Sequence, residues 1–446
     1  MSARTWVSLL PRALQFAFAG RPTLQKVAAS TGWLFLERIV RIAVGLFVGA
    51  WVTRYLGPKD FGAISYATAF VALFSTIATL GLDEIVVRDI VREAELKFEV
   101  LGSAFLLKAV AGTIVAVITV AVIGALEPSH GVMIALVGVG AFANVFLAFD
   151  TIELWFRSQM QSEYVAFARG CAFLALSCGK VLLILAHAPL VCFAWAGAAE
   201  TALAALGLVV LCRRSGAELR RWRWNKAVAA RLLRDSWPLI FSGIVIMIYM
   251  RIDQIMLARM VGAEEVGIYS VAVRVAEVWY FIPMTIVAAV SPAIIAAKQV
   301  SDELFYERLQ QLYNLMALLA YLVAIPMALL SKPIIIVLFG ASYAKAGPML
   351  AVLIWAGMFT NLGVARSVFL STMNWAKVHF MTVLLGSIIN VALNFLLIPA
   401  YGGMGAVIAS CVAYWFAAHG ACFVYRPLFR TGFMLTKAML WPKVWK

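Results

Sequence analysis

The sequence predicts an all-α protein that is embedded in a membrane and crosses it about twelve times. Hydrophobic residues make up 64% of the 446 residues and charged residues 13%, whereas a soluble domain has roughly half and a quarter. The apolar residues form long blocks, such as 102–124, 131–149 and 380–398. A helix needs about 20 such residues to cross the hydrocarbon layer. The short alternating segments of a membrane β-barrel are not visible.

The apolar blocks follow one another along the chain, separated by joints that contain helix breakers such as Gly57-Pro58 and Glu127-Pro128. We expect spans at residues 31–55, 62–81, 100–124, 131–152, 164–186, 189–212, 236–260, 268–294, 312–331, 347–371, 378–399 and 403–425.

Basic residues predict the orientation of these spans. They cluster in an amphipathic N-terminal arm (1–30), a central linker (213–235) and a C-terminal tail (426–446), which lie on one side of the membrane if there are twelve spans. Loops 125–130, 187–188 and 400–402 contain no Lys or Arg. Because Lys and Arg concentrate in cytoplasmic loops, both termini are expected in the cytoplasm. The chain then divides into an N-lobe at 31–212 (spans one to six) and a C-lobe at 236–425 (spans seven to twelve).

Composition and motifs exclude several classes of protein. The net charge is +15, and most of the Lys and Arg residues lie in the loops between spans. This is the distribution expected of loops that face anionic lipid headgroups, so nucleic acid is not an expected partner. The six cysteines form no C-x-x-C pair, and no metal-ligand spacing with histidine occurs, so no metal or cofactor is expected. The joints are too short for a catalytic or nucleotide-binding domain, and no Walker motif is present. We therefore do not expect an enzyme.

An internal repeat supports two pseudo-symmetric six-helix lobes. Arg54-Tyr-Leu-Gly57-Pro-Lys-Asp60-Phe-Gly62 aligns without gaps with Arg259-Met-Val-Gly262-Ala-Glu-Glu265-Val-Gly267. In both copies the glycines suit a tight turn between helices, and the acidic residue suits a helix start. Parallel repeats joined by a cytoplasmic loop place a central cavity between lobes that rock for alternating access. A transporter uses this arrangement directly.

Ionisable residues inside the predicted spans are the candidate functional residues. Each costs about 2.5–3.5 kcal/mol at a span centre, so they are expected to face protein or water. Glu37 and Arg41 share a helix face and can pair, whereas Arg251 and Asp253 are two residues apart, on different faces, so at least one of them needs a partner on a neighbouring helix. The candidate cations are Arg38, Arg41, Lys180, Arg251, Arg274 and Arg366, and the candidate coupling or ion-pair carboxylates are Glu37, Asp150, Asp253 and Glu277. Snorkelling and structural ion pairs remain the alternative, especially for Arg38, Glu153 and Arg169.

Several motifs together resemble the polysaccharide-transporter (Wzx-like) flippases of the multidrug/oligosaccharidyl-lipid/polysaccharide (MOP) exporter superfamily. The resemblance covers nearly the whole chain. It rests on the 54–62 motif, Arg251-Ile-Asp-Gln-Ile-Met-Leu257, Val266-Gly-Ile-Tyr-Ser270, Leu338-Phe-Gly-Ala-Ser-Tyr343 and Gly402-Gly-Met-Gly-Ala406.

This resemblance implies two lobes and a substrate, an oligosaccharide linked to undecaprenyl diphosphate. Such units would move from the inner to the outer leaflet of the bacterial inner membrane for O-antigen, capsule or exopolysaccharide synthesis. It also implies that Arg38, Arg41, Arg251 and Arg274 meet the diphosphate. Membrane lipids are expected partners, and polymerase or export machinery is left open. The alternative is a MATE-like multidrug or cation antiporter, which would need a cavity dominated by acidic residues. A membrane-bound glycosyltransferase or polymerase would need a long outer loop with catalytic carboxylates.

Overall fold

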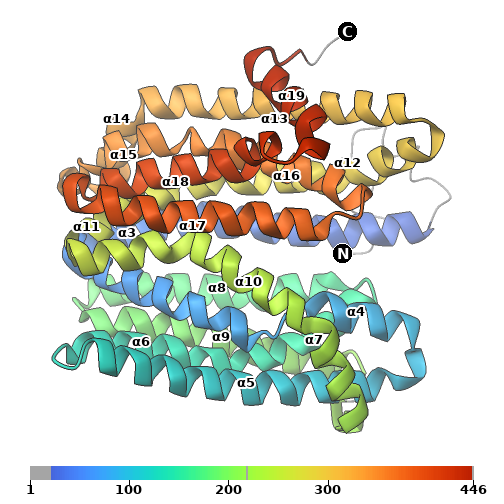
Figure 1. Cartoon of the computed structure of the whole chain (residues 1–446). Coiled ribbons are helices and arrows are strands. Elements are labelled where there is room, and N and C mark those ends of the chain that lie inside the picture. Colours follow the sequence, from blue (N-terminus) through green and yellow to red (C-terminus); the bar gives the residue numbers. More distant parts are fainter. Residues whose placement is uncertain (1–21, 217–218, 444–446) are drawn as a thin grey trace. The chain divides into compact units, whose positions relative to one another are not determined.

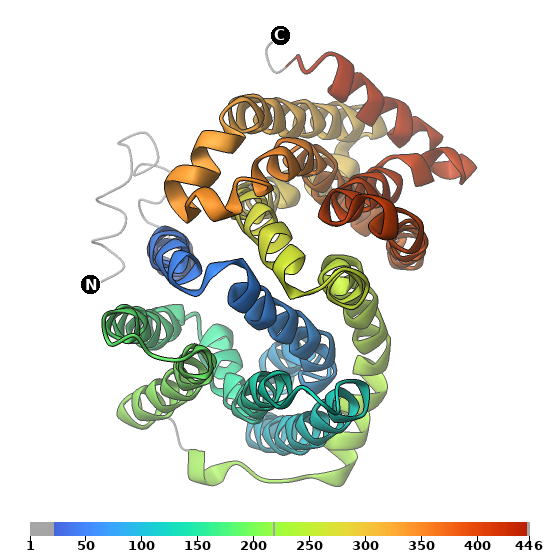
Figure 2. The ribbon, with the colours of Figure 1, turned by 90° about the vertical axis from the view of Figure 1, so that its left-hand side faces the viewer.

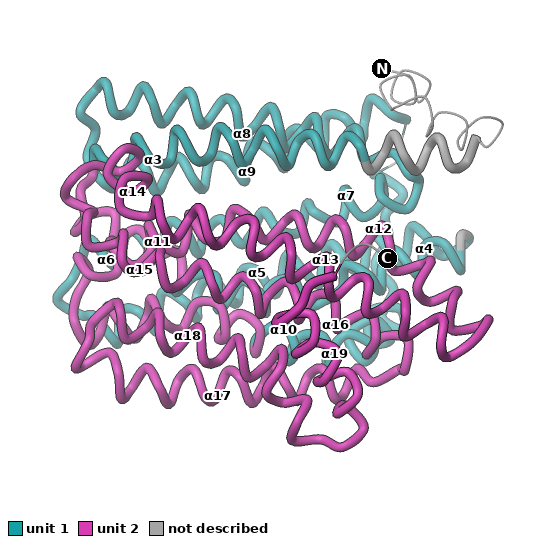
Figure 3. The backbone as a smooth tube through the Cα atoms, turned by 90° about the horizontal axis from the view of Figure 1, so that it is seen from above, with its two compact units in different colours: residues 1–55, 70–244 teal, residues 56–69, 245–446 magenta. Residues whose placement is uncertain are grey.

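The computed structural model describes residues 22–216 and 219–443, and within these ranges the chain is helical and contains no strand (Figure 1). Most of the predicted N-terminal arm, residues 1–21, lies outside the described residues. The chain forms two compact units (Figure 3). Unit 1 contains the chain up to Tyr55 and residues Phe70–Ile244, and unit 2 contains Leu56–Ala69 and Val245–Lys446.

The number of spans agrees with the sequence prediction. Ten helices in the described residues are long and apolar enough to cross a membrane. The first of these, Gly32–Arg92, covers most of α3 (Pro22–Ala78), which is broken at Gly57 and therefore holds two spans. Counting both limbs of α3 and adding the shorter apolar helix Gly403–Ala418 gives twelve. The protein is therefore a multi-pass membrane protein.

Unit 1 is a helical bundle whose elements are α3 before and after the 56–69 segment, α4 (Asp83–Arg92), η1 (Ala94–Leu96), α5 (Lys97–Leu126), α6 (Gly131–Ala143), η2 (Asn144–Phe149), α7 (Asp150–Ser158), α8 (Ser162–Leu185), α9 (Leu190–Arg214), η3 (Leu219–Arg221) and the first part of α10 (Lys226–Met260). The 3-10 segment η2 joins α6 to α7 in one span, and Ser75 donates a hydrogen bond to Asn144 Oδ1 there (2.7 Å). One core packs Leu82, Val86, Leu101 and Leu232 together.

Unit 2 contains the rest of α10 and a second bundle, and Figure 2 shows the helices of each unit nearly end-on. Its core is centred on two helices, α13 and α16, with Phe305, Tyr313, Leu362 and Phe369 among the fully buried side chains. Its elements are α11 (Ala263–Glu277), η4 (Val278–Tyr280), α12 (Phe281–Val300), α13 (Asp302–Leu329), α14 (Ser331–Phe339), η5 (Ala341–Tyr343), α15 (Ala346–Leu353), α16 (Ala356–Thr372), α17 (Ala376–Tyr401), α18 (Gly403–Ala418), η6 (Gly420–Phe423), η7 (Arg426–Leu428) and α19 (Phe429–Leu440).

The two copies of the internal repeat adopt matching backbone conformations. Gly57 has φ 73° and ψ 172°, and Gly262 has φ 125° and ψ 173°. Both are in the region of positive φ that glycine adopts without strain, so the predicted glycine turns are confirmed. The other two glycines of the repeat lie where α3 and α11 approach closely: Gly62 on α3 packs against α11, and Gly267 on α11 packs against α3. A methyl group added at Gly62 would lie 1.7 Å from the carbonyl oxygen of Ala263, and one at Gly267 would lie 2.0 Å from that of Pro58.

The remaining motifs of the resemblance also form turns in unit 2. Gly340 ends α14 with φ 96°, and Gly402 joins α17 to α18 with φ 55°. The backbone N–H of Gly403 donates to Glu265 Oε1 (3.1 Å), so the acidic residue of the second repeat caps the start of α18. Buried Tyr343 lies 6.3 Å, between ring centroids, from Phe61. These motifs therefore specify how consecutive spans of unit 2 are joined.

Candidate functional site

Most of the mid-span charges of unit 1 form one cluster, whereas those of unit 2 form an ion pair and two separate buried sites. In unit 1 the centre is Arg41 on α3. Its Nε donates to Glu37 Oε1 (2.7 Å), the predicted pair one turn earlier, and Nη1 donates to Glu200 Oε1 on α9 (3.1 Å). Nη2 donates to the backbone carbonyl of Arg169 on α8 (3.4 Å). The guanidinium also lies 4.7 Å from the centre of the Phe173 ring. Arg41 thus joins three helices.

Other members of the unit 1 cluster are also ion-paired. Lys180 on α8 donates to the second oxygen of Glu200 (3.1 Å). Nη2 of Arg169 lies 3.0 Å from a carboxylate oxygen of Asp150 and 2.6 Å from one of Glu153. The two carboxylates are one helical turn apart on α7. The cluster therefore contains four carboxylates and three cations.

Arg38 differs from these residues. Its side chain is exposed and makes no ion pair within the described residues. Among the candidate cations of unit 1, it is the one whose charge is available to a ligand without breaking an ion pair found in the described part of the chain.

In unit 2 a second ion pair connects α10 to α11. Two guanidinium nitrogens of Arg251 lie 3.3 Å from the two carboxylate oxygens of Glu277. Both side chains are about one-quarter exposed. Arg274 lies one helical turn before Glu277 and is half-buried. The prediction that at least one of Arg251 and Asp253 has its partner on a neighbouring helix is confirmed by this pair. A guanidinium that makes a bidentate contact of this kind can also bind two oxygens of a phosphate.

Asp253 points away from this pair into the interior of unit 2. Its side chain is buried, and its carboxylate accepts hydrogen bonds from Tyr269 Oη (2.7 Å), Asn394 Nδ2 (2.6 Å) and Ser410 Oγ. Asn394 also donates to Asn390 Oδ1 (3.2 Å). All these donors are neutral. The cage therefore satisfies the carboxylate by hydrogen bonds without supplying a balancing positive charge.

Arg366 is enclosed by protein in unit 2, with 1% of its surface exposed. Nη2 donates to Thr382 Oγ1 (3.0 Å) on α17 and to the carbonyl of Ala417 (2.8 Å), and Nη1 donates to Cys422 Sγ (3.2 Å). Ala417 belongs to the last turn of α18, whose carbonyls have no partners within the helix and carry partial negative charge. Arg366 therefore caps the end of α18.

We expect Arg366→Met to lower the free energy of unfolding by at least about 2 kcal/mol, because buried acceptors lose their donors and α18 loses its cap. Arg366→Lys should recover only part of this, since an ammonium cannot reproduce the planar fork that contacts three groups. Thermal unfolding in detergent measures the effect, with exposed Lys345→Met as control. Wild-type stability in Arg366→Met would contradict the capping role.

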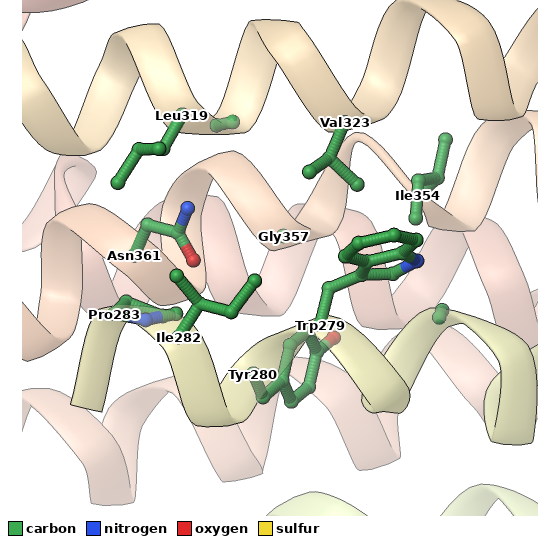
Figure 4. A pocket seen from close by; sticks show the side chains of 11 residues that line it. Trp279, Tyr280, Ile282, Pro283, Leu319, Val323, Ile354, Gly357 and Asn361 are labelled. Carbon is green, nitrogen blue, oxygen red and sulfur yellow. The ribbon is translucent and has the colours of Figure 1, made fainter. Parts of the chain in front are cut away.

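A pocket lies inside unit 2 where η4 interrupts the span formed by α11 and α12 (Figure 4). Its cavity volume is about 40 Å³. Trp279 and Tyr280 line it together with Asn361 of α16. Asn361 Nδ2 donates to the carbonyl of Met316 (3.5 Å), and aliphatic side chains of α13 close the opposite wall.

The polar partners of Asp253 are not apparent from the sequence. Asn390 and Asn394 are four residues apart in an otherwise apolar span, a spacing that places both on one helix face and marks them as candidates. Nothing local in the sequence connects them to α10. In the described residues, no three His, Cys, Asp or Glu side chains are grouped as a metal site would require.

Two family models match the chain. One, described as polysaccharide biosynthesis protein, matches residues 27–298, and the other, described as MatE, matches residues 238–396. No curated protein matches the chain significantly.

Solved structures show the same fold at low sequence identity. An inward-facing multidrug resistance MATE family transporter of the MOP superfamily superposes with a TM-score of 0.73 at 15% identity, covering 90% of this chain and 99% of the other. The lipid II flippase MurJ in an inward closed conformation gives 0.65 at 14%, covering 92% and 91%. A MOP superfamily transporter from Pyrococcus furiosus, described by a reversed polarity of its binding pocket, gives 0.64 at 14%, covering 93% and 96%.

Proposed function

This chain belongs to the polysaccharide biosynthesis protein family of the MOP superfamily, and from that membership we propose that it is a flippase for undecaprenyl-pyrophosphate-linked oligosaccharides. It moves these units from the inner to the outer leaflet of the bacterial inner membrane by alternating access, with both termini in the cytoplasm. The observation that carries the proposal is the family match over 27–298, a range that contains Arg38, Arg41, Arg251 and Arg274. The protein acts as a transporter and performs no covalent chemistry.

The cations have distinct roles in this proposal. Arg38 is exposed and meets the diphosphate first. Arg251 exchanges its two contacts with Glu277 for two contacts with a phosphate, which offers the same planar pair of oxygens. Arg274 adds positive charge one turn away. Arg41 and Lys180 hold the helices of unit 1 together through Glu200, and Arg366 holds α18. Substrate contact is therefore assigned mainly to Arg38, Arg251 and Arg274.

Asp253 is proposed as the coupling residue. Taking up a proton or a sodium ion neutralises its charge where the cage of Tyr269, Asn394 and Ser410 provides none. Asn394 Oδ1 has no hydrogen-bond partner within the described residues, so it is available as a further oxygen for a cation. Glu277, the other candidate, is engaged by Arg251 and takes part in substrate exchange instead.

A MATE-like antiporter is the second candidate. It is favoured by the MatE match at 238–396 and by the unit 1 cluster, where Glu37, Asp150, Glu153 and Glu200 outnumber their three cationic partners. Such a cluster suits a cationic substrate better than a diphosphate.

A leaflet assay separates the two candidates. Vesicles containing the purified protein and a fluorescent undecaprenyl-diphosphate oligosaccharide should show transfer of the label between leaflets. Arg251→Ala and Arg274→Ala should each slow transfer by about tenfold or more, the loss expected when a charge-assisted hydrogen bond of 1.5–3 kcal/mol is removed. Lys345→Ala, which removes an exposed cation in the turn between η5 and α15, should transfer at the wild-type rate. Absence of transfer by the wild type, together with export of cationic dyes, would replace the flippase with the antiporter.

A further inference from the structure

The last apolar helix is too short to cross the membrane alone. α18 contains 16 residues and is therefore about 24 Å long, against a hydrocarbon layer of about 30 Å. It begins at the Gly402 turn, which joins it to α17 and so lies at or beyond one membrane surface. By length, α18 alone therefore ends short of the opposite surface, and η6 (Gly420–Phe423) continues the chain beyond α18. The cap provided by Arg366 on Ala417 explains how a helix ends at this point.

The chain then turns aside into α19. Figures 1 and 2 both show α19 crosswise to the spans of unit 2. Three side chains of α13 fasten it to the bundle through backbone carbonyls. Gln310 donates to Met434 (3.2 Å), Asn314 to Lys443 (2.6 Å) and Tyr321 to Met439 (2.7 Å). Leu435 and Ala438 on the inner face of α19 are fully buried in the core of unit 2. The helix is thus held in a fixed orientation with one face outward.

The outward face combines large apolar side chains with positive charge. Phe433, Leu440 and Trp441 are 63%, 77% and 63% exposed, and Lys437 is exposed between them. Residues separated by four, seven and eight positions lie on one side of a helix. The last acidic residue of the sequence is Glu307, so no carboxylate side chain follows it that could neutralise this face from the same segment. Exposed Arg426 and Lys443 flank the helix.

We propose that this face, Phe433, Lys437, Leu440 and Trp441 with Arg426 and Lys443 beside it, binds the anionic phospholipids of the leaflet that α19 faces. The aromatic and aliphatic groups enter the acyl chains, and the cations extend to the headgroups, as lysine does when its stem lies along apolar surface. A polar protein partner would leave Phe433 and Leu440 unmatched, whereas a lipid surface matches both the apolar and the cationic groups.

The test uses the full chain in vesicles of phosphatidylethanolamine with a minor share of phosphatidylglycerol. A photoreactive benzoylphenylalanine replaces Leu440, and mass spectrometry identifies the adducts formed on illumination. Phosphatidylglycerol should be enriched about fivefold over its share in the vesicle, which corresponds to the roughly 1 kcal/mol that one cation near an anionic surface contributes. The enrichment should disappear in Lys437→Gln combined with Lys443→Gln, provided that thermal unfolding matches the parent.

The matched control places the same photoreactive residue at Leu396 on α17, which is 71% exposed in a stretch without basic residues. Its adducts should follow the bulk lipid composition. The proposal would be overturned if the adducts at position 440 also had the bulk lipid composition. It would likewise be overturned if the adducts formed mainly with a second copy of the chain. The readout is lipid contact and not transport, so its outcome is independent of whether the protein carries a lipid-linked oligosaccharide.

Discussion

Replacing Gly62 by alanine is expected to destabilise unit 2 by more than about 3 kcal/mol, beyond the usual range for overpacking. The added methyl group would lie 1.7 Å from the carbonyl oxygen of Ala263 and 2.9 Å from the amide nitrogen of Gly267. Both are backbone atoms at the start of α11 and cannot move aside as a flexible side chain does. Gly267→Ala should act similarly, because its methyl would lie 2.0 Å from the carbonyl oxygen of Pro58. Thermal unfolding of the detergent-solubilised protein measures both effects.

Two glycines without such neighbours serve as matched controls. A methyl group at Gly124 on α5 or at Gly197 on α9 would meet no atom within 4 Å. Alanine at either site should be neutral or should stabilise by up to about 1 kcal/mol, because alanine favours the helix more than glycine does. If Gly62→Ala unfolds at the same temperature as Gly197→Ala, the two repeat copies do not approach each other as closely as the structure shows.

These glycines also show which part of the fold is predictable from sequence. The gapless match between the copies at 54–62 and 259–267 predicted two equivalent turns, and Gly57 and Gly262 adopt them. A turn depends on the conformational freedom of a few adjacent residues, so it is visible locally. The direct contact between Gly62 and Gly267 is between residues far apart in the chain, and spacing within one copy cannot reveal it.

The ion pairs between helices, in contrast, could not be predicted from the sequence. Lys180 and Glu200 look isolated in their spans, yet Glu200 accepts hydrogen bonds from both Lys180 and Arg41. A charged residue inside a span requires a partner, but the sequence does not show whether protein or substrate provides that partner. Arg366 illustrates this most clearly. Among the residues that the structure describes, its acceptors are a hydroxyl, a thiol and a carbonyl, and the carbonyl matters because α18 ends early, which the predicted span at 403–425 does not anticipate.

The same reasoning changes which residues are expected to carry transport. The number of Lys and Arg residues inside the spans suggests a cationic cavity. Ion pairs with carboxylates, however, neutralise much of this positive charge. Arg41, Arg169 and Lys180 each contact a carboxylate. Two groups of unit 2 differ in kind: the partly exposed ion pair of Arg251 with Glu277, which lies one turn from the half-buried Arg274, and the enclosed carboxylate of Asp253. The first suits exchange with a phosphate and the second suits coupling to an ion, so variants of the two should have different effects.

Asp253→Asn is expected to abolish the response of transport to an imposed gradient while leaving the protein folded. The side chain keeps its volume, and the hydroxyl groups of Tyr269 and Ser410 can rotate to accept from the new amide, so the cage adapts. The ionisable group is lost, however, and no proton or cation is then required to neutralise it. The transport rate should fall to the value measured without a gradient. Imposing proton and sodium gradients separately on wild-type vesicles identifies the coupling ion.

Asp253→Leu should behave differently, because it leaves Tyr269, Asn394 and Ser410 without their shared acceptor. Each orphaned buried donor costs about 1–3 kcal/mol, so this variant should lose more than about 3 kcal/mol of stability and insert poorly. Asp302→Asn is the matched control, since it makes the same chemical change at an exposed aspartate paired with Lys298. Its transport should keep the wild-type response. A gradient response that persists in Asp253→Asn would move the coupling function away from the Asp253 cage, with Glu277, the other candidate carboxylate of unit 2, as the next residue to vary.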